Sequence, residues 1–342
     1  MNKRRRITIK DVAREAGVSI TTVSRYINKN YGAMTEETRQ RIKNVIDSLG
    51  FQPNKLAQGL KGPSRNIAVV VVNIGYPFCV SVIRSISKVL SEAGYNLMVC
   101  ETGGDPKREE TMIRSLIAQN IGGLIIQTNG ENNPLIEEIA QTVPVVLIDR
   151  EFNIPSVVNV VTNDQEASKQ LTCALFREGY QKVLYITEPL GNISTRKERL
   201  QGYTLACEEY NREPWITEIE RGNTTIQQSV VHQIIGSSAT SPFAIYTANG
   251  LIMLDFYPLL KATHVAIPNF MGLATFDKPD WATLITPSLT CVHHPTDEMG
   301  NFAAREILQQ IKDGRTYNHH IVVIDSTVIW SHSTQLQRQL KE

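Results

Sequence analysis

Residues 8–28 read TIKDVAREAGVSITTVSRYIN, and this pattern predicts two short helices joined by one tight turn. Thr8 and Asp11 stand three residues apart, so the side chain of each can bond the backbone N–H of the other and start a helix. Gly17 is expected to end this helix, because glycine readily adopts a left-handed backbone. The hydroxyl of Ser19 is then expected to cap the second helix.

One face of the second helix is expected to stay exposed, because Val23 and Ile27 continue the buried side. The outward residues are Ile20, Thr21, Ser24, Arg25 and Asn28. Hydroxyls, an amide, a guanidinium and one branched apolar group suit the major groove of DNA. Arg25 can pair with guanine, Asn28 can reach a base edge or a phosphate, and Ile20 can touch a thymine methyl group. The alternative is a helical hairpin in an ordinary core, which the surrounding positive charge disfavours.

Positive charge is concentrated at the N-terminal end of the chain. Residues 1–62 hold 13 Lys and Arg against 5 Asp and Glu, a formal charge of +8, and the rest of the chain carries −7. A basic segment neutralises phosphates and releases counterions, which favours salt-sensitive DNA binding. The run Lys3-Arg4-Arg5-Arg6 directly precedes the helix pair and is therefore interpreted as an arm that contacts phosphates.

Residues 1–52 are predicted to form an all-α head, whose third helix starts near Thr35 and ends at Gly50. Residues 53–64 are expected to be a linker with a helix of about two turns, which is marginal alone in water and is expected to fold on DNA. Leu60 can act as a wedge that opens a base step in the minor groove. On composition alone, a plain connector with an incidental leucine would be favoured.

Strand and helix patterns alternate from Ile67 onward. Strands are expected at residues 67–72, 95–100, 123–127, 144–148, 183–187, 243–246, 264–272 and 321–324. Helices are expected near residues 82–90, 108–119, 134–141, 165–178, 196–210, 227–236, after 249, and at 296–313. This alternation predicts two tandem α/β lobes with parallel sheets covered by helices on both faces. Ligands of such sheets bind at the carboxyl ends of the strands, so a cleft between the lobes is the expected site.

The sequence contains no motif that indicates an enzyme. It has no G-x-x-x-x-G-K-[ST], no G-x-G-x-x-G after a strand and no G-x-S-x-G. A recombinase that carries a helix-turn-helix would need a catalytic serine or tyrosine domain, and none is evident. The doublets His293-His294 and His319-His320 lack a Cys or a carboxylate at metal-ligand spacing. Neither a metal nor another cofactor is therefore expected.

The chain is expected to be cytoplasmic. Its five cysteines are scattered and odd in number, which favours reduced thiols over disulfides. There is no run of 18 or more apolar residues, so no membrane span is expected. The basic start is followed by Ile7-Thr-Ile-Lys-Asp11 rather than by an apolar segment, so no signal peptide is expected.

The order of these parts resembles the LacI/GalR family of bacterial transcription regulators over essentially the whole chain. The most specific matches are residues 11–19 and 22–25 of the head, and Pro53, Asn54, Ala57 and Leu60 of the linker. Looser matches in the body are residues 144–150, 199–202, 276–277, 286–290 and 294–300. The resemblance implies a homodimer that binds a palindromic operator, and a small molecule in the cleft that changes the affinity for this operator.

The resemblance also implies a body like the periplasmic sugar-binding proteins, with lobes that are discontinuous in sequence. The first lobe would comprise residues 65–161 and 290–322, and the second residues 162–289 and 323–342. This chain departs from the family at Thr275, where the family has glycine, and at Gly250, where an aspartate is often seen. The usual arginine before Ser333-Thr334 is absent, and residues 335–342 show no leucine heptads for a tail-made tetramer.

Two groups of contacts are carried over from the family by position. The DNA contacts would be Thr8, Ile20, Thr21, Ser24, Arg25, Asn28, Asn54, Lys55, Ala57 and Leu60, and the effector contacts would be Phe78, Arg150, Arg199, Asn249 and Asp277. Arg199 is expected to make a bidentate bond to a carboxylate or a hydroxyl pair. Asn249 and Asp277 would bond hydroxyl groups. Arg150 or Asp277 can instead form a structural ion pair, and Phe78 can instead be a core residue.

The expected effector is acidic, because two cleft arginines stand against few carboxylates. Residues 31–39 and 194–199 resemble regulators of 2-keto-3-deoxygluconate utilisation in Gram-positive bacteria. The sequence therefore predicts a repressor of carbohydrate catabolism genes that a sugar acid of this kind controls. The alternatives are a regulator that responds to a neutral sugar or a nucleobase, and a cytoplasmic solute-binding protein.

Overall fold

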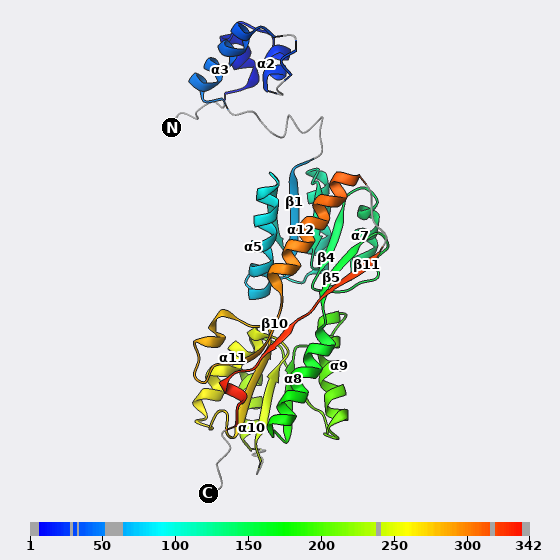
Figure 1. Ribbon diagram of the computed structural model, residues 1–342, viewed down its shortest axis with the longest axis vertical. Helices are drawn as coiled ribbons and strands as arrows, with labels where there is room; N and C mark the ends of the chain where they lie inside the picture. The colour runs from blue at the N-terminus through cyan, green and yellow to red at the C-terminus, as the bar shows by residue number, and fades with distance from the viewer. Residues whose placement is uncertain are drawn as a thin grey trace. The chain divides into compact units, whose positions relative to one another are not determined.

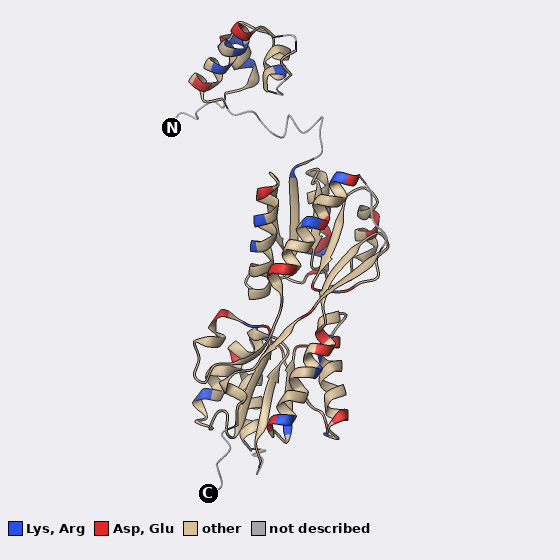
Figure 2. Cartoon of the chain, viewed as in Figure 1, with Lys and Arg blue, Asp and Glu red and all other residues tan. Residues whose placement is uncertain are grey.

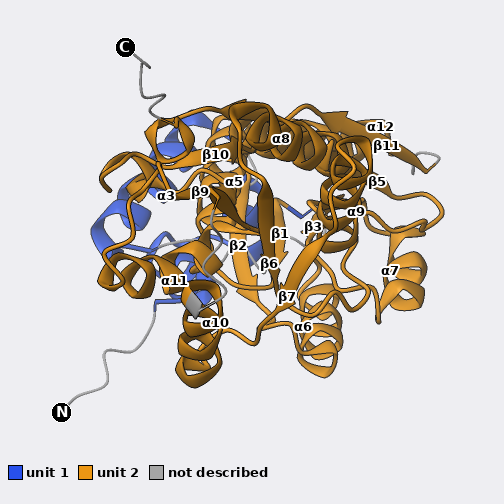
Figure 3. Cartoon of the chain, turned by 90° about the horizontal axis from the view of Figure 1, so that it is seen from below, with its two compact units in different colours: residues 1–64 blue, residues 65–342 orange. Residues whose placement is uncertain are grey.

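The computed structural model describes residues 7–27, 30–32, 34–51, 64–236, 241–314 and 319–336. The chain divides into two compact units, residues 1–64 and 65–342, which Figure 3 shows in blue and orange. The predicted linker helix and the predicted DNA contacts at Asn28, Asn54, Lys55, Ala57 and Leu60 lie outside the described residues.

The first unit contains the predicted helix-turn-helix. Its helices are α1 (Ile9–Glu15), α2 (Ile20–Ile27) and α3 (Glu36–Leu49). The Thr8 N–H donates to the Asp11 carboxylate at 2.9 Å, and Gly17 has the left-handed φ of 64° that ends α1. The Thr22 N–H donates to the Ser19 hydroxyl at 3.1 Å, which confirms the predicted cap of α2. Val12, Val23 and Ile42 are fully buried, so the three helices share one core.

The first lobe of the second unit is built on a six-stranded parallel sheet in the order β11-β5-β4-β3-β1-β2. Its strands are β1 (Asn66–Val71), β2 (Asn96–Glu101), β3 (Gly123–Ile126), β4 (Val145–Ile148), β5 (Val158–Thr162) and β11 (His320–Ile324). Its helices are α5 (Pro77–Glu92), α6 (Pro106–Ala118), α7 (Asn133–Ala140) and α12 (Thr296–Asp313). Helices α5 and α12 cover one face of the sheet and α6 and α7 cover the other, so two separate apolar cores flank the strands (Figure 1).

The second lobe repeats this plan in the order β12-β10-β9-β8-β6-β7, with β12 antiparallel. Its strands are β6 (Lys182–Thr187), β7 (Trp215–Glu218), β8 (Phe243–Thr247), β9 (Met271–Phe276), β10 (Thr290–His293) and β12 (Thr327–Ile329). Its helices are α8 (Asp164–Glu178), α9 (Ser194–Glu209), α10 (Thr224–Gly236) and α11 (Gly250–Ala262), with short 3-10 turns η2 (Asp280–Thr283) and η3 (His332–Thr334). Charged residues lie mainly on the helices and loops, and the strands are almost free of them (Figure 2).

The chain passes between the lobes three times, after β5, after β10 and after β11 (Figure 1). The two sheets are thereby placed with the carboxyl ends of their parallel strands toward each other. The predicted all-α head and the predicted two-lobed α/β body are confirmed. None of the described helices combines the length and the apolar character that crossing a bilayer requires.

Two expectations about the second lobe are wrong. The strand expected at residues 264–272 runs from Met271 to Phe276, because the carbonyl of Ala266 accepts the N–H groups of both Phe270 and Met271 and makes a turn there. The return to the first lobe was expected at residue 290, but Thr290–His293 forms β10. This strand pairs with β9 and β12, so the return begins only after His293.

Candidate functional site

The exposed face of α2 is the candidate DNA-binding surface of the first unit. Ile20 is 45% exposed although it is a large apolar residue, and Thr21 and Arg25 are also exposed. Ser24 is half-buried on the same helix, and Thr8 is exposed at the start of α1. A buried Val23 anchors the opposite face of α2. This arrangement leaves the predicted base-reading groups of the described residues on the side of the helix away from the core.

A cavity of about 150 Å³ lies between the two lobes, where the carboxyl ends of the two sheets face each other. The first lobe lines it with Val72, Asn73, Tyr76, Cys79, Gln127, Asp149 and Arg150, and the second with Glu188, Ile193, Thr195, Arg196, Arg199, Arg221, Ala248, Asn249 and Leu251. His294, in the segment that returns to the first lobe, completes the lining. Three of the predicted effector contacts, Arg150, Arg199 and Asn249, therefore share one cavity.

Arg150 is the cation of the first-lobe wall and follows β4. Its Nη1 donates to the carbonyl of Thr128 at 3.2 Å and to the side-chain oxygen of Asn129. Its Nε lies 3.8 Å from the carboxylate of Asp149, and this nitrogen is buried without a hydrogen-bond partner among the described residues. Burial lowers the pKa of the guanidinium, and the charge of Asp149 partly opposes this effect. The Nη1 of Arg150 is thus held by the protein, whereas its Nε–H donates no hydrogen bond within the described residues.

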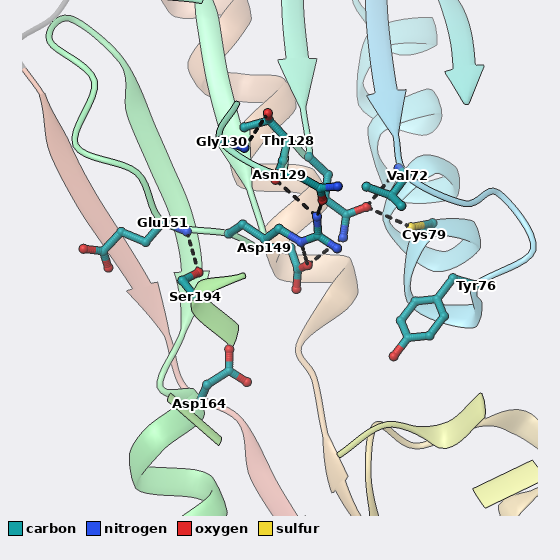
Figure 4. Close-up of polar contacts among 12 residues, drawn as sticks. Val72, Tyr76, Cys79, Thr128, Asn129, Gly130, Asp149, Glu151, Asp164 and Ser194 are labelled. Carbon is teal, nitrogen blue, oxygen red and sulfur yellow. Dashed lines mark hydrogen bonds and ion pairs between the residues drawn. The ribbon is translucent and has the colours of Figure 1, made fainter. Parts of the chain in front are cut away.

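Asp149 and its neighbours form the polar floor of the first lobe (Figure 4). The side-chain amide of Gln127 donates through Nε2 to Asp149 at 2.6 Å, and its Oε1 accepts the N–H of Val72 at 3.2 Å. Burial raises the pKa of Asp149, while the charges of Arg150 and Arg199 lower it. Asp149 also has a left-handed φ of 73°, an uncommon conformation for a residue with a side chain.

The second-lobe wall presents Asn249, Glu188 and Arg196. The Asn249 side chain accepts the N–H of Ile252 at 2.9 Å, which caps α11, and donates to Glu188 at 2.9 Å. Glu188 in turn pairs with Arg196 at 3.0 Å. Asn249 was expected to bond a ligand directly, but the structure gives both ends of its amide a protein partner. The remaining lone pairs of Glu188 and Asn249 still make this wall a place for hydroxyl groups.

Each nitrogen of Arg199 contacts a protein group at the cavity wall. Its Nε donates to Asp164 at 2.8 Å, and its Nη1 donates to the carbonyl of Ala248 at 2.9 Å. Its Nη2 lies 3.3 Å from the Nε2 of His294, and its guanidinium stands 3.9 Å above the ring of Phe276. In this structure these protein contacts occupy all three nitrogens of Arg199, so a bidentate bond to a ligand stays a prediction. Arg199 ties α9 to the start of α8.

Asp277 and Phe78 lie beside the cavity rather than in its wall. Both line a neighbouring groove of about 440 Å³. Asp277 accepts the hydroxyl of Tyr76 at 2.5 Å, which joins the second lobe to the first, and stands 3.4 Å from the Nδ1 of His294. Phe78 is buried and meets the His294 ring edge-on at 5.3 Å between centroids. Phe78 belongs to the apolar core of the first lobe, as its alternative role predicted, and its contact with an effector stays a prediction.

Several residues that line the cavity were not predicted as effector contacts, namely Tyr76, Gln127, Asp149, Glu188, Arg196, Arg221 and His294. Gln127, Asp149 and Glu188 directly follow β3, β4 and β6, so their position after a buried strand was the available signal. Four arginines line the cavity, two more than expected, against two carboxylates, Asp149 and Glu188. Arg196 pairs with Glu188 at 3.0 Å, and Arg199 pairs at 2.8 Å with Asp164, which is not part of the lining.

Comparison with known protein families finds two matches. Residues 8–54 match the family described as "Bacterial regulatory proteins, lacI family". Residues 64–333 match the family described as "Periplasmic binding proteins and sugar binding domain of LacI family". The two matches meet near the division between the two compact units.

Individual relatives match over nearly the whole chain. The HTH-type transcriptional regulator KdgR of Bacillus subtilis (strain 168) is 35% identical over 309 residues, which cover 89% of this chain and 91% of the relative. The HTH-type transcriptional regulator PtxS of Pseudomonas putida is 32% identical over 314 residues, with 90% and 91% covered. Among solved structures, the lac repressor dimer bound to operator and the anti-inducer ONPF has a TM-score of 0.82 at 19% identity, with 97% and 100% covered.

Proposed function

Because this chain belongs to the LacI family of bacterial transcription regulators, we propose that it represses genes of carbohydrate catabolism by binding a palindromic operator as a homodimer in the cytoplasm. The exposed face of α2, with Ile20, Thr21 and Arg25, would read bases in the major groove. A small molecule in the cavity between the lobes would change the affinity for the operator. A solute-binding protein without a DNA target would leave this head without a role.

The effector that we propose is a sugar acid such as 2-keto-3-deoxygluconate. The observation that carries this proposal is Arg150, a buried cation of the cavity wall whose Nε has no hydrogen-bond partner among the described residues. A carboxylate is the natural acceptor for such a guanidinium edge. Glu188 and Asn249 on the opposite wall would accept or donate to the hydroxyl groups.

A neutral sugar is the competing effector, because the Glu188 and Asn249 wall would bond its hydroxyl groups equally well. The contribution of Arg150 to the binding affinity should differ between the two ligands. Loss of a bidentate charge-assisted bond costs about 1.5–3 kcal/mol, which is about a tenfold to a hundredfold loss of affinity. A neutral ligand would lose much less when the guanidinium is removed.

Calorimetric titration of the full chain tests the effector. We expect 2-keto-3-deoxygluconate to bind more tightly than glucose or a nucleobase, and Arg150→Met to weaken it by about tenfold or more. Arg212→Met is the matched control, because Arg212 is exposed and does not line the cavity. Tight binding of glucose with no binding of sugar acids would rule out the proposed effector class.

Selection from random duplexes tests the DNA-binding proposal. We expect the wild-type chain to recover a palindrome, and Arg25→Ala to lose about 1–3 kcal/mol and to relax one base position in each half-site. Arg41→Ala is the control, because Arg41 is exposed on α3 rather than on α2 and should not change the base preference. Recovery of no preferred sequence, with and without the candidate effectors, would contradict the proposal.

A further inference from the structure

We propose that Glu109, which does not line the cavity, is a positioning residue for Arg150. Glu109 holds the loop at residues 128–132, and this loop holds the Arg150 guanidinium in place at the cavity wall through its Nη1. The inference rests on the proposed function in one respect, namely that Arg150 binds the carboxylate of the effector.

Glu109 is a buried carboxyl group with uncharged partners. It lies on α6 and is only 4% exposed. Its Oε1 accepts the hydroxyl of Thr128 at 2.9 Å and the side-chain amide of Asn132 at 2.9 Å. Burial raises the pKa of this carboxyl group, and the two hydrogen bonds partly offset the effect. Burial of a carboxyl group costs free energy of folding. We therefore expect Glu109 to have a role in ordering the groups to which it is hydrogen-bonded.

The groups that Glu109 orders are the same ones that hold Arg150. The Thr128 hydroxyl also accepts the N–H of Gly130 at 3.1 Å, and the Thr128 carbonyl accepts the Nη1 of Arg150 at 3.2 Å. Asn129 accepts the same Nη1 and donates to the carbonyl of Gly104 at 3.2 Å. Thr128, Asn129 and Gly130 thus form a single turn beside the cavity (Figure 4). The two acceptors of Nη1, the Thr128 carbonyl and the Asn129 side chain, both belong to this turn.

The consequence is a path from α6 to the cavity in which each step is a hydrogen bond. Without an acceptor at position 109, the Thr128 hydroxyl and the Asn132 amide lose a buried partner, and the turn is free to shift. A shift of the turn moves the acceptors of Nη1 and therefore turns the guanidinium. The strength of a hydrogen bond from the guanidinium to a carboxylate depends steeply on the distance and angle between the two groups. The residues of the second lobe that would bind hydroxyl groups are not moved by this change.

Three variants separate this role from a merely structural one. Glu109→Met keeps the length of the side chain and removes the acceptor, whereas Glu109→Gln keeps one oxygen acceptor. Glu110→Met is the matched control, because Glu110 carries the same charge on the exposed face of the same helix, where it pairs with Arg114. Thr128→Val is a second test of the same path, since it removes the hydroxyl that joins Glu109 to the turn.

The first measurement is the affinity of the full chain for 2-keto-3-deoxygluconate and for its neutral methyl ester. We expect Glu109→Met and Thr128→Val to weaken the acid by about tenfold and the ester by less than about twofold. Glu109→Gln and Glu110→Met should bind both ligands as the wild type does. Equal weakening of acid and ester, or no weakening of either, would overturn the proposal.

The second measurement is the Nε–H resonance of Arg150 in the ligand-free, ¹⁵N-arginine-labelled protein, assigned with Arg150→Lys. We expect Glu109→Met and Thr128→Val to shift this resonance, and Glu109→Gln and Glu110→Met to leave it in place. An unmoved resonance in Thr128→Val would overturn the positioning role even if Glu109→Met does not fold. If the wild type binds no sugar acid, the proposed effector fails, and the resonance still decides the role of Glu109.

Discussion

Replacement of Gly202 by alanine is expected to destabilise the second lobe strongly. Gly202 lies in α9 where this helix crosses α8, and a Cβ at this position would stand 2.0 Å from the carbonyl oxygen of Gln165 and 2.9 Å from the N–H nitrogen of Lys169. Both atoms belong to the backbone and cannot turn aside, so the helices must separate. We expect a loss of about 3 kcal/mol or more in the free energy of unfolding.

Urea unfolding followed by tryptophan fluorescence measures this effect selectively. The three tryptophans, Trp215, Trp281 and Trp330, all lie in the second lobe. Gln201→Ala is the control, because residue 201 is exposed on the same helix and alanine favours the helix there. A transition of Gly202→Ala at the wild-type urea concentration would show that α8 and α9 do not pack as described.

Arg199→Met is expected to destabilise the body by about 3–5 kcal/mol near neutral pH. It removes the cation from Asp164, whose side chain is 1% exposed. Burial alone would raise the pKa of Asp164, but the charge of Arg199 and the hydrogen bonds from His294 and Arg199 outweigh it and hold the pKa below its ordinary value. Without Arg199, an ionised carboxylate would remain buried beside the cavity.

The sign of the pH dependence follows from this lowered pKa. In the wild type, the Asp164 carboxylate contributes stability above its unfolded pKa of about 4, and this contribution is lost as the pH falls through the folded value. In Arg199→Met the carboxylate instead costs stability when it is ionised and stops doing so when it is protonated. The difference between the two proteins should therefore be largest near pH 7 and should shrink in acid.

Two further variants test the cause of this loss. Asp164→Asn combined with Arg199→Met should recover part of the stability, because no charge then remains buried without a partner. Arg196→Met should cost about 1 kcal/mol or less, since Arg196 and Glu188 are partly exposed and solvent screens the pair. A loss in Arg199→Met that does not depend on pH would point to packing against Phe276 rather than to the charge of Asp164.

Local signals in the sequence were sufficient for the head. The caps at Thr8 and Ser19, the left-handed Gly17 and the end of α3 at Gly50 are confirmed because each depends on residues at most five apart. The same holds for most strands and helices of the body. The strand expected at residues 264–272 was placed too early, because the apolar residues Val265, Ala266 and Ile267 were counted as part of it, whereas the strand is Met271–Phe276.

The cavity could be located from the sequence but not described from it. The rule that ligands bind at the carboxyl ends of parallel strands led to the right place, and Arg150, Arg199 and Asn249 do line it. The hydrogen-bond partners of each side chain could not be predicted from this rule. Whether Arg199 faces a ligand or Asp164 depends on how α8 and α9 cross, and a single glycine at position 202 allows that crossing.

Residue spacing alone thus specified the helix-turn-helix, the alternating α/β body and the two lobes, because hydrophobic periodicity and capping act within a few residues along the chain. Tertiary contacts alone decided which arginine of the cavity keeps an unused donor. No local sequence pattern distinguishes Arg150 from Arg199. The Nε of Arg199 nevertheless lies 2.8 Å from the carboxylate of Asp164, whereas the Nε of Arg150 lies 3.8 Å from the carboxylate of Asp149. Such pairings depend on the approach of separate strands and helices, which no local pattern records.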